Sequence, residues 1–403
     1  MSKPPSSTAN ITTVTISCHC QTNRIKATIP TSSLPLKSAL CHCHSCRHVT
    51  GQMFATFAVI PADVPVEFQH SHSGDAGDDD DDGTAKVIRY QSSPNITRVS
   101  CRVCGASLGN VEYERPRASE VDRGKKGAVL EWEAATGCLY ISSDGEDGVG
   151  GAVEGDNAKT NLTGKLDRVQ LWVDDVQDDG GAVGWINAGQ LSGMNRFWRG
   201  RDSDVVMNDE VKAIWEARNE ATGNKSSSTS ISSAKTQLKV RCHCGNVDFD
   251  ITRPELDYNQ GTGKFPAFFD TCTSCRTVTG FEILSWITVP RRLIMTPATD
   301  LQSYLSDSSK VTHYKTSESV DRYFCSRCAA SVFYYKHGLD ELDLSLGLLQ
   351  SHSNREARIL DWLEWQKYPQ VLSYTEDAVD ENLVTLLAQG LKAERGESTV
   401  NKT

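Results

Sequence analysis

Residues 39–51 read ALCHCHSCRHVTG, and residues 268–280 read FFDTCTSCRTVTG. Both stretches contain the frame Cys-x-x-Cys-Arg-x-Val-Thr-Gly, so the chain carries one cysteine motif twice. The two differ at one chemically important position, because Asp270 of the second stretch stands in the place of Cys41 of the first. A motif that recurs far along a chain indicates an internal duplication.

Other parts of the chain recur in the same order. The aligned blocks, none of which needs a gap, are 17–30 with 241–254, 46–61 with 275–290, and 87–104 with 311–328. These blocks predict two copies of one domain. The expected units are a first zinc domain with acidic insertions, a helix with a Ser/Thr-rich linker, a second zinc domain, and a C-terminal helix and tail, at residues 12–205, 206–237, 238–375 and 376–403.

Length and charge narrow the class of protein. The chain has 403 residues and a formal net charge of −10. This length exceeds one typical domain, and the acidic balance disfavours a nucleic-acid surface, which normally carries a basic stripe. There is no run of about eighteen apolar residues, and the N-terminal MSKPPSSTANITTVT lacks the apolar core of a secretory signal. We therefore expect an intracellular, cytoplasmic protein that neither spans a membrane nor binds nucleic acid.

Local patterns predict mainly strands. Residues 12–16, 54–60 and 281–289 are rich in β-branched and aromatic residues, and the last two segments end at a proline. Helical spacing of apolar residues predicts helices near 209–221 and 376–392. The apolar stripe of the second helix, which we expect to face a core, is Leu383, Val384, Leu386, Leu387 and Leu391.

Several polar segments interrupt this pattern. The acidic run GDAGDDDDDG at 74–83 is predicted to be a solvated loop, since it has no spaced calcium-loop pattern. Residues 114–127 and 143–164 read as insertions, and the Ser/Thr-rich residues 222–236 read as the linker that places the domain boundary.

The chain has fourteen cysteines, of which only Cys138 lies outside a short cluster. In a reducing compartment such clusters indicate metal ligands rather than disulfides. Four thiolates make a closed structural zinc site, whereas three leave a position for water or substrate. The predicted groups are Cys18, Cys20, Cys101 and Cys104; Cys41, Cys43 and Cys46; Cys242, Cys244, Cys325 and Cys328; and Asp270, Cys272 and Cys275. Spacing alone also allows other divisions of the first seven cysteines.

Three further residues are expected to take no part in these sites. His42 and His44 alternate with the cysteines, and alternate side chains in such a segment usually point away from the metal. Neither has a histidine counterpart in the second copy, where Thr271 and Thr273 stand. A lone cysteine such as Cys138 is usually a small buried apolar residue.

The cysteine pattern resembles that of the glutathione-dependent formaldehyde-activating enzyme family, also called the centromere protein V type domain. The segments that carry the resemblance are CHC at 18–20, CHCHSCRHVTG at 41–51 and RVSCRVCG at 98–105, then CHCG at 242–245, DTCTSCRTVTG at 270–280 and RYFCSRCA at 322–329. The resemblance covers residues 12–190 and 238–370, apart from the insertions.

This resemblance implies an all-β fold, in which small antiparallel sheets form a zinc-pinned β-tent, here as two tandem copies with minor helices. It implies structural zinc at the CxC and CxxC pairs and a catalytic zinc site at Cys41, Cys43 and Cys46. It also implies a carbon–sulfur lyase activity that joins glutathione and formaldehyde, as in S-(hydroxymethyl)glutathione synthase. No catalytic residue is assigned beyond the three cysteines.

The chain departs from the family pattern at three positions. Gln21 and Ala329 stand where the family has glycine after a cysteine pair, so we expect altered turns there. Asp270 replaces the first cysteine of the second catalytic cluster. Two thiolates and one carboxylate would hold zinc weakly or as a harder metal centre. We expect the second site to be degenerate, because no replacement thiol lies nearby in the sequence.

The leading hypothesis is therefore a zinc enzyme that joins a thiol such as glutathione to an aldehyde through its first copy. The alternative is a non-catalytic, zinc-stabilised scaffold for protein partners, in which every zinc is structural. A protein side chain that closes a fourth position beside Cys41, Cys43 and Cys46 would favour the scaffold. A chromatin role, which the centromere branch suggests, is disfavoured by the acidic balance.

Overall fold

The computed structural model describes most of both copies, here called the first and second repeats. The described residues are 10–70, 86–114, 128–143, 161–187, 194–207, 210, 236–351 and 353–394. The acidic loop, both insertions, the first predicted helix and the linker lie wholly or mostly outside them, at 74–83, 114–127, 143–164, 209–221 and 222–236. Within the described part, no helix is long and apolar enough to cross a membrane.

The first repeat contains two sheets. One has four strands in the order β10-β1-β2-β5, and the other has seven in the order β11-β3-β4-β9-β8-β7-β6. The strands are β1 (Ile11–Ser17), β2 (Asn23–Pro30), β3 (Leu36–Cys41), β4 (Ala55–Ile60), β5 (Glu67–His70), β6 (Val87–Ser93), β7 (Ile96–Cys101), β8 (Ser107–Tyr113), β9 (Val129–Ala135), β10 (Leu139–Ser143) and β11 (Leu166–Leu171). The edge strand β11 runs parallel to β3, and the other pairings in these sheets are antiparallel.

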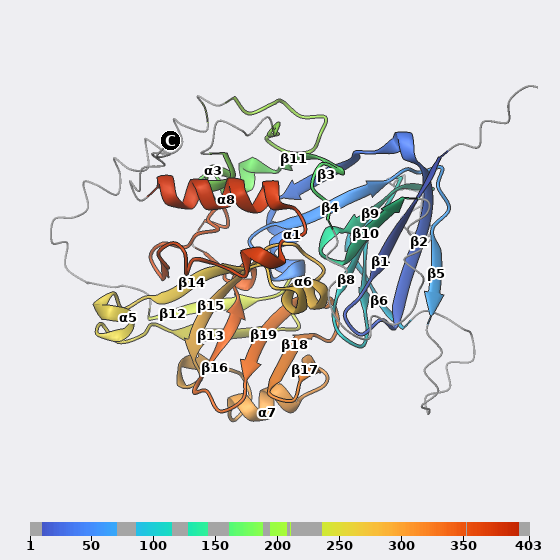
Figure 1. Ribbon diagram of the computed structural model, residues 1–403. Helices are drawn as coiled ribbons and strands as arrows, with labels where there is room; N and C mark the ends of the chain where they lie inside the picture. Colours follow the sequence, from blue (N-terminus) through green and yellow to red (C-terminus); the bar gives the residue numbers. More distant parts are fainter. Residues whose placement is uncertain are drawn as a thin grey trace, which may run out of the picture.

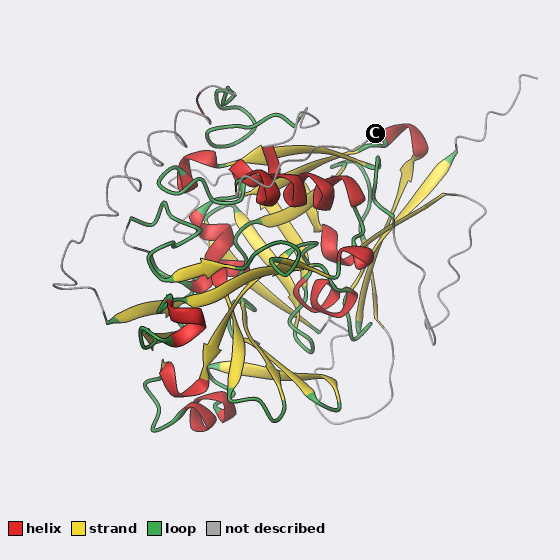
Figure 2. Cartoon of the chain, turned by 60° about the vertical axis from the view of Figure 1, so that its left-hand side comes forward, coloured by secondary structure: helices red, strands yellow, loops and turns green. Residues whose placement is uncertain are grey.

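The second repeat has the same organisation. A small sheet has the order β12-β13-β16, and a larger one has the order β17-β18-β19-β20-β15-β14-β21, with β22 also paired to β14. The strands are β12 (Gln237–Arg241), β13 (Asp248–Thr252), β14 (Phe265–Asp270), β15 (Leu284–Pro290), β16 (Ile294–Met295), β17 (Val311–Ser317), β18 (Val320–Cys325), β19 (Ser331–Lys336), β20 (Glu341–Ser345), β21 (Leu363–Trp365) and β22 (Leu372–Ser373). The strands predicted from sequence appear as β1, β4 and β15, and the all-β tandem fold is confirmed (Figure 2).

Among the described residues the helices are few and short. They are α1 (His44–Thr50), α3 (Val183–Asn187), α5 (Tyr258–Gly261), α6 (Thr273–Thr279), α7 (Leu301–Ser306) and α8 (Glu381–Ala393). The sequence did not predict α1 and α6, because a seven-residue segment is too short to display a helical period. Each helix contains the second half of a repeated cysteine motif. Cys43 Sγ caps α1 by accepting from Cys46 N–H, and Gly51 ends it in the left-handed conformation at φ 80°.

The expectation of altered turns at Gln21 and Ala329 was wrong. Gln21 has φ 58° and Ala329 has φ 59°, whereas the matching glycines of the other repeat, Gly245 and Gly105, have φ 74° and 80°. The left-handed turn is therefore kept at all four positions, although a non-glycine residue is disfavoured in that conformation. The hairpin that holds each cysteine pair needs this turn more than it needs the glycine.

The predicted C-terminal helix is confirmed as α8. Asp380 caps it by accepting from the N–H groups of Asn382 and Leu383. The predicted apolar stripe is buried, as expected. This helix packs on α3, near the end of the first repeat, so closely that a Cβ on Gly390 would overlap the backbone of Trp185. The C-terminal segment thus folds back onto the first repeat (Figure 1).

The two repeats pack against each other through glycine backbones. Gly347 N–H donates to the Gly51 carbonyl at 2.9 Å, and the equivalent Gly137 N–H donates to the Gly280 carbonyl at 2.8 Å. A Cβ on Gly280 would lie 2.2 Å from the carbonyl oxygen of Ser107. Only glycine permits so close an approach, and α1 and α6 consequently lie between the sheets of the two repeats (Figure 1).

Reciprocal side-chain contacts show that the packing is nearly two-fold symmetric. Tyr90 of the first repeat and His243 of the second share a hydrogen bond of 2.7 Å. Tyr314 of the second repeat and His19 of the first share one of 2.9 Å. These residues are equivalent by sequence alignment, so the same contact is made twice with the repeats exchanged. This is the geometry of an isologous dimer formed within one chain.

Candidate metal centres

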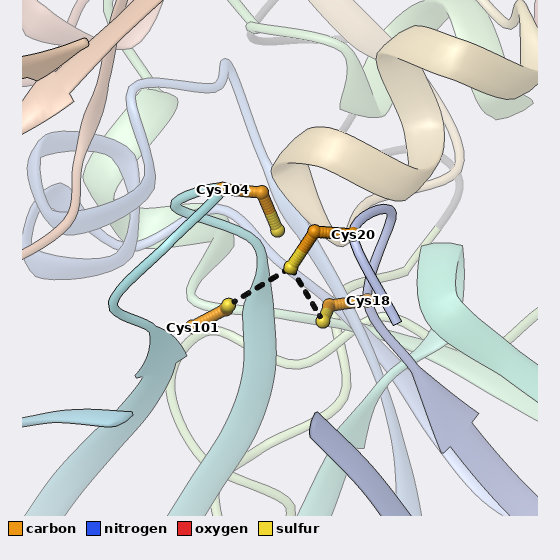
Figure 3. Close-up of side chains that lie close together, drawn as sticks. All are labelled: Cys18, Cys20, Cys101 and Cys104. Carbon is orange, nitrogen blue, oxygen red and sulfur yellow. Dashed lines mark hydrogen bonds between the residues drawn. The ribbon is translucent and has the colours of Figure 1, made fainter. Parts of the chain in front are cut away.

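The first four-cysteine group joins two distant hairpins. Cys18 and Cys20 follow β1, Cys101 ends β7 and Cys104 follows it; all four sulfurs converge, as Figure 3 shows. Cys20 Sγ lies 3.5 Å from Cys18 Sγ and 3.5 Å from Cys101 Sγ. The sulfurs therefore pin the end of the small sheet to the large one.

The second repeat forms the matching group. Cys242 Sγ lies 3.4 Å from Cys244 Sγ and 3.7 Å from Cys325 Sγ, and Cys328 completes the set. Such separations are too long for disulfides, whose sulfurs are about 2.05 Å apart. They are close to the sulfur separation of about 3.8 Å that a tetrahedron with zinc–sulfur bonds of about 2.3 Å requires. Both groups fit a closed four-thiolate zinc site.

The three-cysteine group lies where β3 passes into α1. Cys41 ends the strand, Cys43 caps the helix and Cys46 lies in its first turn. Their sulfurs lie within 4.8 Å of one another, and Cys43 is half-buried while the other two are buried. Among the described residues, no fourth histidine, cysteine or carboxylate joins this group. The donors fit zinc and leave one position without a protein ligand.

An arginine lies against this group. Arg98 Nη2 donates to Cys46 Sγ at 3.2 Å, and Arg98 Cζ lies 5.5 Å from the centroid of the Phe57 ring. The pKa of Cys46 is lowered because hydrogen bonds from Cys41 and Cys43 and the charge of Arg98 stabilise its thiolate. The pKa of Cys41 is raised by hydrogen bonding to the other two sulfurs and by burial. The first negative charge of the group therefore forms at Cys46.

The equivalent group in the second repeat is Asp270, Cys272 and Cys275, whose ligand atoms also lie within 4.8 Å of one another. Asp270 Oδ1 accepts from Cys272 N–H at 2.7 Å, and Asp270 Oδ2 accepts from Cys275 Sγ at 3.5 Å. Arg322 Nη2 donates to Cys275 Sγ at 3.2 Å, as Arg98 does in the first repeat. The pKa of Cys275 is nevertheless raised, because of its hydrogen bond with Cys272, burial and the nearby Asp270 carboxylate.

The residues expected to be bystanders lie outside all four groups. His42 is buried and shares a hydrogen bond of 3.0 Å with Gln170, and burial lowers its pKa to about 3. His44 packs against His48, with ring centroids 4.1 Å apart. Cys138 is buried, and its thiol donates to the Thr277 carbonyl at 3.4 Å. Burial raises the pKa of Cys138 to about 12, so this thiol stays protonated.

The sequence did not point to a polar row that crosses the large sheet beside the three-cysteine group. Arg98 on β7 pairs with Asn110 on β8, and Asn110 pairs with Glu133 on β9. Directly paired residues share one face of a sheet, so the three side chains form one row. We call Arg98, Asn110 and Glu133 the polar row. No sequence pattern links these residues, because only the registers of three strands bring them together.

The described structure can be compared with known families. Residues 13–137 and 237–364 match the model of the family described as "Glutathione-dependent formaldehyde-activating enzyme". The two matched segments correspond to the two repeats. No curated protein and no solved structure gives a significant match to the chain.

Proposed function

Because the chain belongs to the glutathione-dependent formaldehyde-activating enzyme family, we propose that its first repeat is a carbon–sulfur lyase that joins a thiol such as glutathione to an aldehyde such as formaldehyde. The observation that carries this proposal is the group of Cys41, Cys43 and Cys46. Three thiolate donors converge there without a fourth protein ligand among the described residues. That arrangement supports an open catalytic site over the scaffold alternative.

Cys41, Cys43 and Cys46 would hold the zinc in this proposal. Zinc bound in this way would supply a Lewis acid with a free position, at which a substrate thiol is readily deprotonated. Three thiolates carry more negative charge than the metal carries positive charge. Arg98, which donates to Cys46 Sγ at 3.2 Å, offsets part of that excess and fixes the position of the sulfur. Phe57 belongs to the same apolar cluster as Cys41 and Cys46, and Trp172 packs against this cluster.

The second repeat has a degenerate site in this proposal. Asp270 already uses Oδ1 to accept the Cys272 N–H. Tyr334 packs against the buried cluster that contains Cys275, at the position where the first repeat has the shorter Asn110. The two four-cysteine groups hold structural zinc.

The proposal is tested by assaying adduct formation from glutathione and formaldehyde with purified, zinc-loaded protein. Cys43→Ser should abolish the rate above the uncatalysed background. Cys272→Ser is the matched control, because Cys272 caps α6 as Cys43 caps α1, and it should keep the wild-type rate. Equal rates for wild type and Cys43→Ser would contradict the enzyme and leave the zinc-stabilised scaffold.

A further inference from the structure

We propose that Glu133 is the acid–base residue of the first-repeat site, which takes the proton from the substrate thiol and delivers it to the aldehyde oxygen. This inference rests on the proposed function and adds a residue that neither the cysteine motif nor the family match assigns. It is carried by the place of Glu133 in the polar row, by its single hydrogen bond and by its surroundings.

Glu133 lies on the sheet face that the cysteine group occupies. It belongs to the polar row, whose other end, Arg98, touches Cys46 Sγ. On its other side, Glu133 pairs with Val59 of β4. The next pair on the same face of the sheet is Ala135 with Phe57. Phe57 and Ala135 pack with Cys41 and Cys46. Diagonal neighbours on one face lie about 7–8 Å apart, so Glu133 lies beside Phe57, which belongs to the apolar cluster of the cysteines.

The carboxylate is held by one oxygen and free at the other. Asn110, which is 1% exposed, donates through Nδ2 to Glu133 Oε2 at 2.9 Å. Within the described chain, no group donates to Oε1. Glu133 itself is only half-buried, so a small molecule can reach it. A fixed orientation with one unused oxygen is what a proton-transferring carboxylate needs.

The surroundings of Glu133 bring the pKa of its carboxyl group close to neutral pH. Burial, with smaller contributions from the charges of Glu131 on its own strand and of Cys46 on α1, raises its pKa to about 7. Asn110 on β8 and Arg98 on β7 act in the opposite direction, while β4 presents the apolar Val59. A carboxyl group of this kind can both accept and donate a proton near pH 7.

The proposed step balances without an oxidant or reductant. The S–H bond of the thiol breaks and its proton passes to the Glu133 carboxylate. The sulfur electron pair forms the new S–C bond as the C=O π bond breaks, and that electron pair moves to oxygen. The oxygen then takes the proton from the Glu133 carboxyl group. The product is the S-(hydroxymethyl) thioether, a hemithioacetal, and the carboxylate is regenerated.

The second repeat supplies a matched comparison. Arg322, Tyr334 and Asp343 form the equivalent row. Burial raises the pKa of Asp343 to about 6, and Thr288 Oγ1 donates to it at 2.8 Å. In this row Tyr334 lies between Asp343 and Arg322, whose Cζ lies 4.5 Å from the centroid of the Tyr334 ring. Asp343 therefore has a raised pKa similar to that of Glu133, but it lies beside a site that we propose to be degenerate.

The experiment is the pH dependence of adduct formation by zinc-loaded Glu133→Gln, Glu133→Asp, Asp343→Asn and wild-type protein. The active form of Glu133 is the carboxylate, so the wild-type kcat should fall about tenfold per pH unit below about pH 7. Glu133→Gln should lose about 10²–10⁴-fold in kcat and lose this acidic limb. Glu133→Asp should recover part of the rate and show the limb again, and Asp343→Asn should match wild type.

A second readout does not depend on turnover. Infrared difference spectra of the protein should show a carboxyl group that titrates near pH 7 and disappears in Glu133→Gln, with zinc content unchanged. An active wild type whose Glu133→Gln variant keeps the rate and the acidic limb would overturn the inference alone. Equal losses of adduct-forming rate in Glu133→Gln and Asp343→Asn would also overturn it. If Glu133→Gln fails to bind zinc, the Glu133→Asp variant decides: a pH–rate profile without the fall in kcat below about pH 7 would overturn the inference. A wild type that forms no adduct removes the proposed function and this inference together.

Discussion

Arg98 donates to Cys46 Sγ at 3.2 Å, and this contact has a counterpart of the same length between Arg322 and Cys275. The two repeats thus keep the arginine and the cysteine in the first turn of the helix in equivalent places. They differ in the pKa of the cysteine that the arginine contacts, which is lowered for Cys46 and raised for Cys275. The Asp270 carboxylate contributes to the difference, because a negative charge beside a thiol opposes its ionisation.

Removal of one structural cysteine should cost zinc and stability together. Cys20→Ser and Cys244→Ser should each lose one zinc per chain and the cooperative thermal transition of the protein, because each sulfur lies in a closed four-thiolate group. Cys138→Ser is the control, since Cys138 belongs to no group and should leave the zinc content unchanged. Metal analysis and calorimetry measure both quantities. Full zinc content in Cys20→Ser would argue against the four-ligand assignment.

The contact between the repeats should be intolerant of a single methyl group. Gly280→Ala places a Cβ 2.2 Å from the Ser107 carbonyl oxygen, at φ 90°. We expect it to lower the free energy of unfolding by more than about 3 kcal/mol, through strain and overpacking. Gly338 has a similar φ of 83° with nothing within 4 Å, so Gly338→Ala should cost only about 1–2 kcal/mol. Urea denaturation compares the two, and equal costs would rule out the close approach.

A buried ion cluster should link the repeats and the C-terminal helix. Arg168 of β11 donates to Glu282 of the second repeat at 2.7 Å and to Asp380, the cap of α8, at 2.8 Å. All three are at least nine-tenths buried. Arg168→Met would leave two carboxylates unpaired and should cost about 3–5 kcal/mol in the free energy of unfolding.

The matched control for this cluster is the exposed cation of Lys239, which also faces two carboxylates, Asp248 and Asp250, at 3.0 Å each. Because solvent screens that pairing, Lys239→Met should cost less than about 1 kcal/mol. The same urea titrations measure both variants. If Arg168→Met is no more costly than Lys239→Met, the buried cluster does not hold the repeats together.

The sequence predicted the duplication, the main strands and helix α8, because repeated cysteine spacing and the periodicity of apolar residues are local patterns. Spacing left the division of the cysteines open, and the family resemblance implied the groups that the structure brings together. The mutual packing of the repeats depends on backbone contacts of Gly51 and Gly280, which look like ordinary turn glycines in the sequence. The polar row depends on the registers of β7, β8 and β9, which the sequence does not encode locally. For the same reason Glu133 could not be singled out in advance.

We predict that a sulfur ligand at position 41 gives an active site, whereas an oxygen ligand at position 270 does not. The most direct measurement is therefore the zinc content and adduct-forming rate of Cys41→Asp beside those of Asp270→Cys. Cys41→Asp should lose one zinc and the activity, because it reproduces the second-repeat group in the first, and Asp270→Cys should gain one zinc. A Cys41→Asp protein that keeps the wild-type zinc content and rate would show that the first-repeat site does not need the Cys41 thiolate.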